Sequence, residues 1–217
     1  MRNKRRLNLY KNAGTTLVEI IVSFALLAIF LTAAATIIST ITNNYYRTKG
    51  ETYAKQVSDI ILEKVVSEIE GAKYEPVAED ETSTVNPLIS NKHSSSTITL
   101  YDRTDTKVDI YADTGDKELK IYYYPIENKV DSSKSRSATT WKFDKGVYNG
   151  YSIESLTFVY GNELSSFSGA SDYGFDTSNV TYGNNVIVVF LKMDSPKYDE
   201  YYTYRVVKMY NIPDTSN

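Results

Sequence analysis

The sequence predicts an α+β fold, in which one long N-terminal α-helix packs on an antiparallel β-sheet. The first observation behind this prediction is an uncharged apolar run near the N-terminus, followed by apolar residues at helical spacing. The second is a change after residue 96 to short alternating segments rich in tyrosine and β-branched residues. The third is that most connections between these segments are short, which favours antiparallel pairing. We therefore expect three parts: a basic segment over residues 1–14, a helix over 15–71 and a β-rich head over 72–217.

Charge is distributed unevenly along the 217 residues. The remainder of the chain after residue 14 comprises 19 basic and 27 acidic side chains, a net charge of −8. This net negative charge argues against a nucleic-acid partner, because a protein that binds nucleic acid needs a basic face. The absence of cysteine excludes disulfides and thiolate metal sites. Residues 1–14 contain five cations and no acid: Arg2, Lys4, Arg5, Arg6 and Lys11.

A run of 27 residues, Ile20–Tyr46, carries no charge. A helix needs roughly 20 apolar residues to cross the hydrocarbon core of a bilayer, and the densest part of the run, Ile20–Ile41, meets that length. We expect the membrane-spanning segment over about residues 17–41. Since the basic cluster precedes it, the positive-inside rule predicts a cytoplasmic N-terminus and a head outside the cytoplasmic membrane.

Glu19 lies directly against this apolar run. A carboxylate near lipid costs a few kcal/mol, so such residues are usually paired or functional. One simpler alternative is a signal anchor that tolerates Glu19 near the interface. Another is a secretory signal cut after Ala35, since Ala33–Ala35 matches a small-x-small cleavage site. Glu19 and the length of the apolar segment count against this second alternative.

The segment around Glu19 resembles the cleavage and methylation motif of type IV pilins and of the pseudopilins of type II secretion. In that family a basic leader ends in Gly, a prepilin peptidase cuts after it, and the fifth residue of the mature chain is Glu. The matching residues here are Gly14, the new N-terminal Thr15, and Glu19, with Thr16–Glu19 close to the family motif. The family commonly has Phe where this chain has Thr15. The resemblance implies cleavage between Gly14 and Thr15 and, as is usual in the family, N-methylation of the new terminus.

Cleavage after Gly14 would create a positive α-amine four residues before the carboxylate of Glu19. An unpaired carboxylate is unfavourable in a low-dielectric surrounding, and the amine of a neighbouring subunit can neutralise it. In the family this pairing guides subunits into the growing fibre. The resemblance thus implies three partners: prepilin peptidase, other pilin subunits that pack through the N-terminal helix, and the cytoplasmic membrane.

Helical spacing continues beyond the membrane segment, and no proline interrupts residues 41–70. Gly71 is expected to end the helix, which would run from about Thr16 to about Glu70. Gly50 is a weak point, so two shorter helices with a break there are an alternative. The apolar residues that recur mostly at intervals of three, four or eight are Ile41, Tyr45, Tyr53, Val57, Ile60, Ile61, Val65 and Ile69.

An irregular connector over 72–96 precedes five or six predicted strands, and 107–124 is predicted to form a hairpin around a turn at Asp113–Asp116. Loops are expected over 126–150 and 161–185. The order of the last segments loosely resembles that of larger minor pilins and J-type pseudopilins, whose final strands form a second small sheet. The predicted strands are Thr97–Tyr101, Lys107–Tyr111, Glu118–Tyr124, Ser152–Tyr160, Asn185–Met193 and Tyr201–Tyr210, with a further short one around Trp141–Phe143.

No residue pattern in the head predicts catalysis, a metal site or a cofactor. The single histidine, His93, lies in a Ser-rich loop, and the sequence has no phosphate-binding or paired-histidine motif, so we expect no enzyme. Glu79–Glu81 and the loop 172–179 contain oxygen ligands for calcium, but neither matches an EF-hand, and polar surface loops are the simpler interpretation. Seven tyrosines suit either strand packing or partner contact: Tyr122, Tyr123, Tyr124, Tyr198, Tyr201, Tyr202 and Tyr204.

Together these features predict a structural subunit of a type IV pilus or of a type II secretion-like pseudopilus, and a minor subunit rather than a major one. Its expected location is the cytoplasmic membrane and then a cell-surface fibre. The alternative, from another functional class, is a membrane-anchored surface binding or adhesion protein that never polymerises. Adhesion, motility, DNA uptake and secretion all use such fibres.

Overall fold

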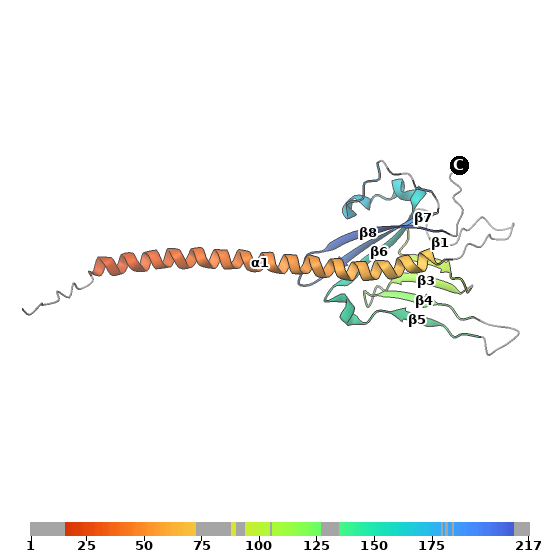
Figure 1. Ribbon diagram of the computed structural model, residues 1–217, viewed down its shortest axis with the longest axis horizontal. Helices are drawn as coiled ribbons and strands as arrows, with labels where there is room; N and C mark the ends of the chain where they lie inside the picture. Colours follow the sequence, from red (N-terminus) through yellow and green to blue (C-terminus); the bar gives the residue numbers. More distant parts are fainter. Residues whose placement is uncertain are drawn as a thin grey trace, which may run out of the picture. The chain divides into compact units, whose positions relative to one another are not determined.

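The computed structural model describes residues 16–72, 88–89, 94–104, 106–126, 135–178, 180, 182–183 and 185–210. The chain divides into two compact units, Met1–Tyr46 and Arg47–Asn217, and helix α1 (Leu17–Glu70) contributes to both. Figure 1 shows the order of the elements along the chain, with α1 first and all strands after it. Gly14 and Thr15, the predicted cleavage residues, lie outside the described part, as do His93 and Glu79–Glu81.

Helix α1 is continuous over 54 residues, as the absence of proline predicts. The alternative of two helices with a break at Gly50 is therefore not realised. The helix ends at the predicted place, because the backbone N–H of Gly71 donates to the Ser67 carbonyl and that of Ala72 donates to the Ile69 carbonyl, each at 3.2 Å. The second of these bonds spans only three residues, which tightens the last turn and closes the helix.

Five strands form the first sheet in the order β1-β2-β3-β4-β5, and each neighbouring pair is antiparallel. Ile98, Ile110 and Ile121 lie opposite one another across three strands and are fully buried, so one face of this sheet is apolar. The predicted hairpin is confirmed. Its turn is held by the Asp113 carboxylate, which accepts the backbone N–H groups of two following residues. The strands are β1 (Leu88–Ile89), β2 (Thr97–Tyr101), β3 (Lys107–Ala112), β4 (Leu119–Tyr123) and β5 (Thr139–Lys142).

A second sheet contains β6 (Ser152–Tyr160), β7 (Val186–Asp194) and β8 (Tyr201–Lys208), antiparallel in that order. The head therefore has two antiparallel sheets where the strand pattern predicts one. Between the two sheets, just before β6, Asn149 and Gly150 both adopt positive φ, 50° and 84°. This conformation suits Asn and Gly.

The predicted strands are confirmed, and each observed strand end lies within two residues of the predicted one. Strand β1 is missing from the prediction because its two residues, within the expected connector over 72–96, are too few to show an alternating pattern. The expected loops contain three short 3₁₀ helices: η2 (Lys145–Tyr148), η3 (Gly161–Ser166) and η4 (Ala170–Tyr173). Such pieces have no strong sequence signature.

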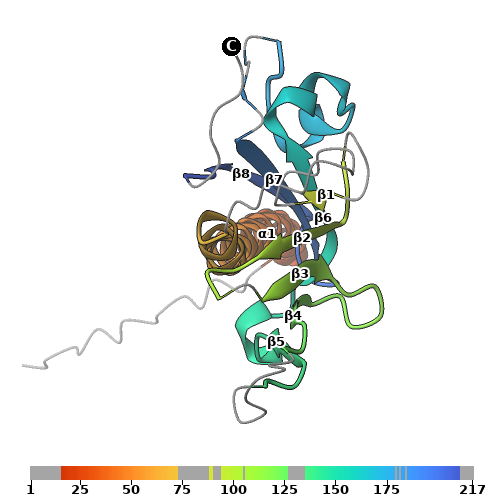
Figure 2. The same ribbon diagram turned by 90° about the vertical axis from the view of Figure 1, so that its right-hand side faces the viewer.

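The main hydrophobic core joins the second half of α1 to both sheets, which lie beside it in Figure 2. A smaller core lies on the other face of the second sheet, where the connection between β6 and β7 folds over Val159, Val188 and Phe190. The α+β fold predicted from the sequence is thus present, with the helix packed on antiparallel sheets. The helix contributes Ala54, Val57, Ile61, Leu62, Val65 and Ile69 to the main core.

Candidate functional site

The first turn of α1 contains a reciprocal pair of hydrogen bonds between Thr16 and Glu19. The backbone N–H of Thr16 donates to Glu19 Oε2 at 2.8 Å, and the backbone N–H of Glu19 donates to Thr16 Oγ1 at 3.3 Å. The helix then begins, with the Ile20 N–H donating to the Thr16 carbonyl at 3.2 Å. This arrangement is a capping box, which satisfies two of the amide groups that a helix leaves unpaired at its N-terminus.

The capping box gives Glu19 a local role in addition to the assembly role that the resemblance implies. Thr16-Leu17-Val18-Glu19 fits the sequence signature of a capping box, a Ser or Thr followed three residues later by Glu, so the signal was present. The carboxylate also lies where the helix macrodipole favours negative charge. Its second oxygen, Oε1, has no partner among the described residues. Glu19 can therefore hold the start of its own helix and still accept a hydrogen bond from an outside donor.

Beyond Glu19, large apolar side chains of α1 are exposed on every side of the helix. Leu17, Phe24, Ile29 and Phe30 each keep about two thirds or more of their surface accessible, and α1 has no buried residue before Gly50. In the described part of the chain, α1 is the one helix long and apolar enough to cross a membrane. A helix that is apolar all round needs an apolar surrounding, such as lipid or the helices of other subunits.

Gly50 marks the point where α1 enters the main core of the second unit. Tyr198, in the loop between β7 and β8, packs directly on it: a Cβ atom added at Gly50 would lie 2.7 Å from Tyr198 Cδ1. The hydroxyl of Tyr151 donates to the Gly50 carbonyl at 3.1 Å, and its ring stacks on Tyr198 with centroids 5.8 Å apart. Burial raises the pKa of Tyr151 to about 12, so this hydroxyl keeps its proton at physiological pH. Two tyrosines and one glycine thus fix the helix to the head.

A polar cluster fixes the other end of the packed helix to the first sheet. Glu68 accepts a hydrogen bond at 2.9 Å from the hydroxyl of Tyr123 on β4 and also pairs with Lys64 one turn earlier. The ammonium of Lys64 lies 4.9 Å from the ring centroid of Trp141 on β5. Burial is the main cause of the raised pKa of Tyr123, and the hydrogen bond to the Glu68 carboxylate raises it further. The cluster keeps its charged groups paired at the edge of the core.

The predicted tyrosine surface is not brought together as one patch. Tyr123 points to the helix, whereas its neighbours Tyr122 and Tyr124 pack edge to face, 4.8 Å apart, on the other side of the first sheet. Tyr198 covers Gly50, and Tyr204 packs on Phe175 in the smaller core. Most of these tyrosines therefore serve strand and core packing.

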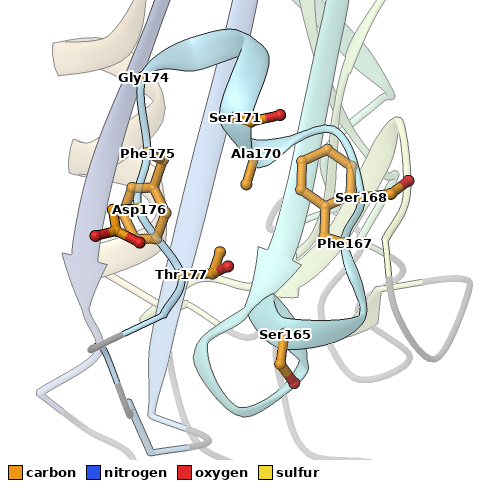
Figure 3. Close-up of a pocket in the computed structure, with 9 residues that line it drawn as sticks. All are labelled: Ser165, Phe167, Ser168, Ala170, Ser171, Gly174, Phe175, Asp176 and Thr177. Carbon is orange, nitrogen blue, oxygen red and sulfur yellow. The ribbon is translucent and has the colours of Figure 1, made fainter.

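In the loop over 172–179 the structure describes residues 172–178, and Asp176 there bonds within the loop. Asp176 accepts hydrogen bonds from the backbone N–H and hydroxyl of Ser178, and these lower its pKa below the ordinary value. Among the described residues there is no group of three or more His, Cys, Asp or Glu side chains that could hold a metal ion. The loop instead borders an open pocket of about 540 Å³, shown in Figure 3.

Comparison of the chain with family models, with curated proteins and with solved structures finds no match.

Proposed function

We propose that this protein is a structural subunit, and a minor one, of a type IV pilus or a type II secretion-like pseudopilus. In this proposal a prepilin peptidase cuts between Gly14 and Thr15 and methylates the new N-terminus. The apolar part of α1 first spans the cytoplasmic membrane, with the head outside the cell. It later packs against the helices of other subunits in a fibre. The role is structural and involves no catalysis by the chain.

The observation that carries the proposal is a single carboxylate, Glu19, at the start of a long helix that is apolar on all sides. Its Oε2 accepts the Thr16 amide, and its Oε1 has no partner in the described part of the chain. Glu19 is thus placed at the helix end with a free oxygen. In lipid or in a fibre core, a charged carboxylate with one of its two oxygens unused favours a cationic partner.

The α-amine that cleavage would create is such a partner. Within one chain, that amine would sit on the residue before Thr16, whose own amide already occupies Glu19 Oε2. A second chain, displaced along the helix axis, can present its amine to Oε1 without breaking the capping box. Pairing between chains would neutralise both charges in a low-dielectric surrounding, which is worth several kcal/mol when the alternative is an isolated buried ion. This gives assembly a direction and a register.

The test uses substitutions that separate the charge of Glu19 from its capping role. Glu19→Gln keeps an oxygen for the Thr16 amide, since Gln serves in capping boxes, but removes the charge. Thr16→Ala removes half of the capping box and keeps the charge. Glu51→Gln is the matched control, because Glu51 is an exposed acid on the same helix outside the apolar run.

Each variant is produced in cells that carry the protein's own assembly system, and the amounts in the membrane and in sheared surface fibres are measured. We expect Glu19→Gln to insert in the membrane normally and to disappear from the fibre fraction. We expect Thr16→Ala and Glu51→Gln to reach the fibres. If Glu19→Gln enters fibres at the wild-type level, the role assigned to its charge is wrong. If wild-type protein stays in the membrane and never enters fibres, the chain is a non-polymerising anchored protein.

A further inference from the structure

The connection between β6 and β7 is far longer than strand pairing requires. It spans 25 residues, from Gly161 to Asn185, although an antiparallel hairpin can be closed by two to five. Two 3₁₀ helices, η3 and η4, lie within it, and it covers the face of the second sheet that α1 leaves free. Long loops with internal structure and a packed core are commonly functional. The length of this connection therefore calls for a reason other than folding.

The described residues of this insertion pack on β7 through aromatic side chains. The rings of Phe167, Tyr173 and Phe175 all contact Phe190 of β7, with centroid distances of 4.9, 5.0 and 5.8 Å. The hydroxyl of Tyr173 also lies 3.1 Å from that of Ser155 on β6. A loop fixed in this way has already lost most of its conformational entropy, so a ligand would not bear that cost on binding.

The insertion surrounds an open pocket of about 540 Å³, within the range of roughly 300–1,000 Å³ that is typical of small-ligand sites. In Figure 3 the rings of Phe167 and Phe175 stand on opposite sides of the space, with Ala170 and Thr177 between them. Ser171 lies above this slot and Ser165 below it. Phe167 is half-buried, whereas Phe175 and Ala170 are buried, so the slot offers a ligand one partly exposed aromatic ring together with the hydroxyl groups of Ser165, Ser171 and Thr177.

The hydroxyls of Ser165, Ser171 and Thr177 have no hydrogen-bond partner within the described part of the chain. Each hydroxyl can donate one hydrogen bond and accept two, so the slot offers both kinds of polar contact to a ligand. No Lys or Arg occurs over residues 146–191. Among the residues that line the slot, the charged one is Asp176, whose lowered pKa keeps its carboxylate negative at neutral pH. An anionic ligand would therefore meet a negative charge and no cation among the lining residues.

We propose that this slot binds a neutral sugar unit of a glycan. A pyranose ring has C–H faces that pack against aromatic side chains, and a rim of hydroxyls that exchange hydrogen bonds with Ser and Thr. The insertion is also rich in Ser, Gly, Asn and Tyr, the residues that recur in surfaces selected for recognition. The proposal concerns the head of a single chain and does not depend on fibre assembly.

The test is binding of the full-length protein, in lipid nanodiscs free of sugar-based detergents, to an array of neutral and sialylated oligosaccharides. The best array ligand is then titrated calorimetrically. We expect neutral oligosaccharides to bind and sialylated forms of the same cores to bind more weakly. Thr177→Val and Ser171→Ala should each reduce the affinity by about fivefold, since each removes one neutral hydrogen bond.

Thr140→Val is the matched control, because Thr140 is an exposed residue on β5 of the other sheet. It should leave the affinity unchanged, and thermal unfolding followed by Trp141 fluorescence should show that all three variants fold. The proposal is overturned if no neutral oligosaccharide binds, if only sialylated ones bind, or if the two pocket variants bind as tightly as the control. None of these results bears on Glu19 or on fibre assembly.

Discussion

Gly50 offers a quantitative test of how the helix is fixed to the head. Replacing glycine by alanine inside a helix normally stabilises it by about 1 kcal/mol. Here the new methyl group would lie 2.7 Å from Tyr198 Cδ1 and 2.8 Å from its Cβ and Cγ, well inside van der Waals contact. Two of these three atoms lie at the base of the ring, so Tyr198 cannot relieve the clash by moving only its far end.

Overpacking of this kind typically costs about 1–3 kcal/mol. Because the gain in helix propensity offsets part of this cost, Gly50→Ala should lower the free energy of unfolding by about 1 kcal/mol. The loss is larger if Tyr198 also moves out of its stacking contact with Tyr151. The assay is urea unfolding of the full-length protein, followed by the fluorescence of Trp141. This residue is the only tryptophan in the chain and packs against the main core.

A second background isolates the clash. In a Tyr198→Ala protein the space beside Gly50 is open, so adding Gly50→Ala should now raise the free energy of unfolding by about 1 kcal/mol. The substitution is thus expected to change sign between the two backgrounds. If Gly50→Ala stabilises the protein with Tyr198 in place, or destabilises it equally in both backgrounds, the proposed contact does not limit the packing of the helix.

Three further predictions concern the stability of the head, each measured by urea unfolding. Tyr123→Phe removes the hydrogen bond to Glu68 without changing the shape of the ring and should cost about 1 kcal/mol; an unchanged midpoint would contradict this. Phe190→Ala empties the centre of the smaller core and should cost about 3–5 kcal/mol, and a loss below 1 kcal/mol would show that the insertion packs elsewhere. Asp113 has a lowered pKa, chiefly because its carboxylate accepts the backbone N–H of Asp116, so its stabilising effect is present above about pH 4 and is lost as the pH falls. Asp113→Asn should therefore be less stable than wild type at pH 7, and the difference should shrink toward pH 2.

The fold could be predicted from the sequence where a long periodic pattern was available. The uncharged run and the helical spacing predict both ends of α1 to within one residue, because no proline interrupts the pattern before Gly71. Strands such as β7 follow from a long apolar run flanked by turn residues. The division into two sheets could not be predicted in this way, because a strand pattern shows which segments are extended and not which of them pair.

The candidate sites show the same contrast. The capping box follows from local spacing, so Thr16 could have been found beside Glu19 in the sequence. The contact between Gly50 and Tyr198 could not, because the two residues are far apart in the chain and meet only through tertiary packing. Gly50 looks like a weak point in a helix until its neighbour is known. The slot in the insertion likewise depends on how Phe167 and Phe175 fold over Phe190, which composition alone does not specify.

The central claim is that the chain is processed as a prepilin. It is tested most directly by the intact mass and N-terminal peptide of the protein purified from membranes of cells that contain a prepilin peptidase. The proposal predicts a chain that begins at Thr15 and carries one methyl group on its α-amine, and full-length protein when the peptidase gene is deleted. A chain that still begins at Met1 in the presence of the peptidase, or one that begins at Thr36, would contradict it.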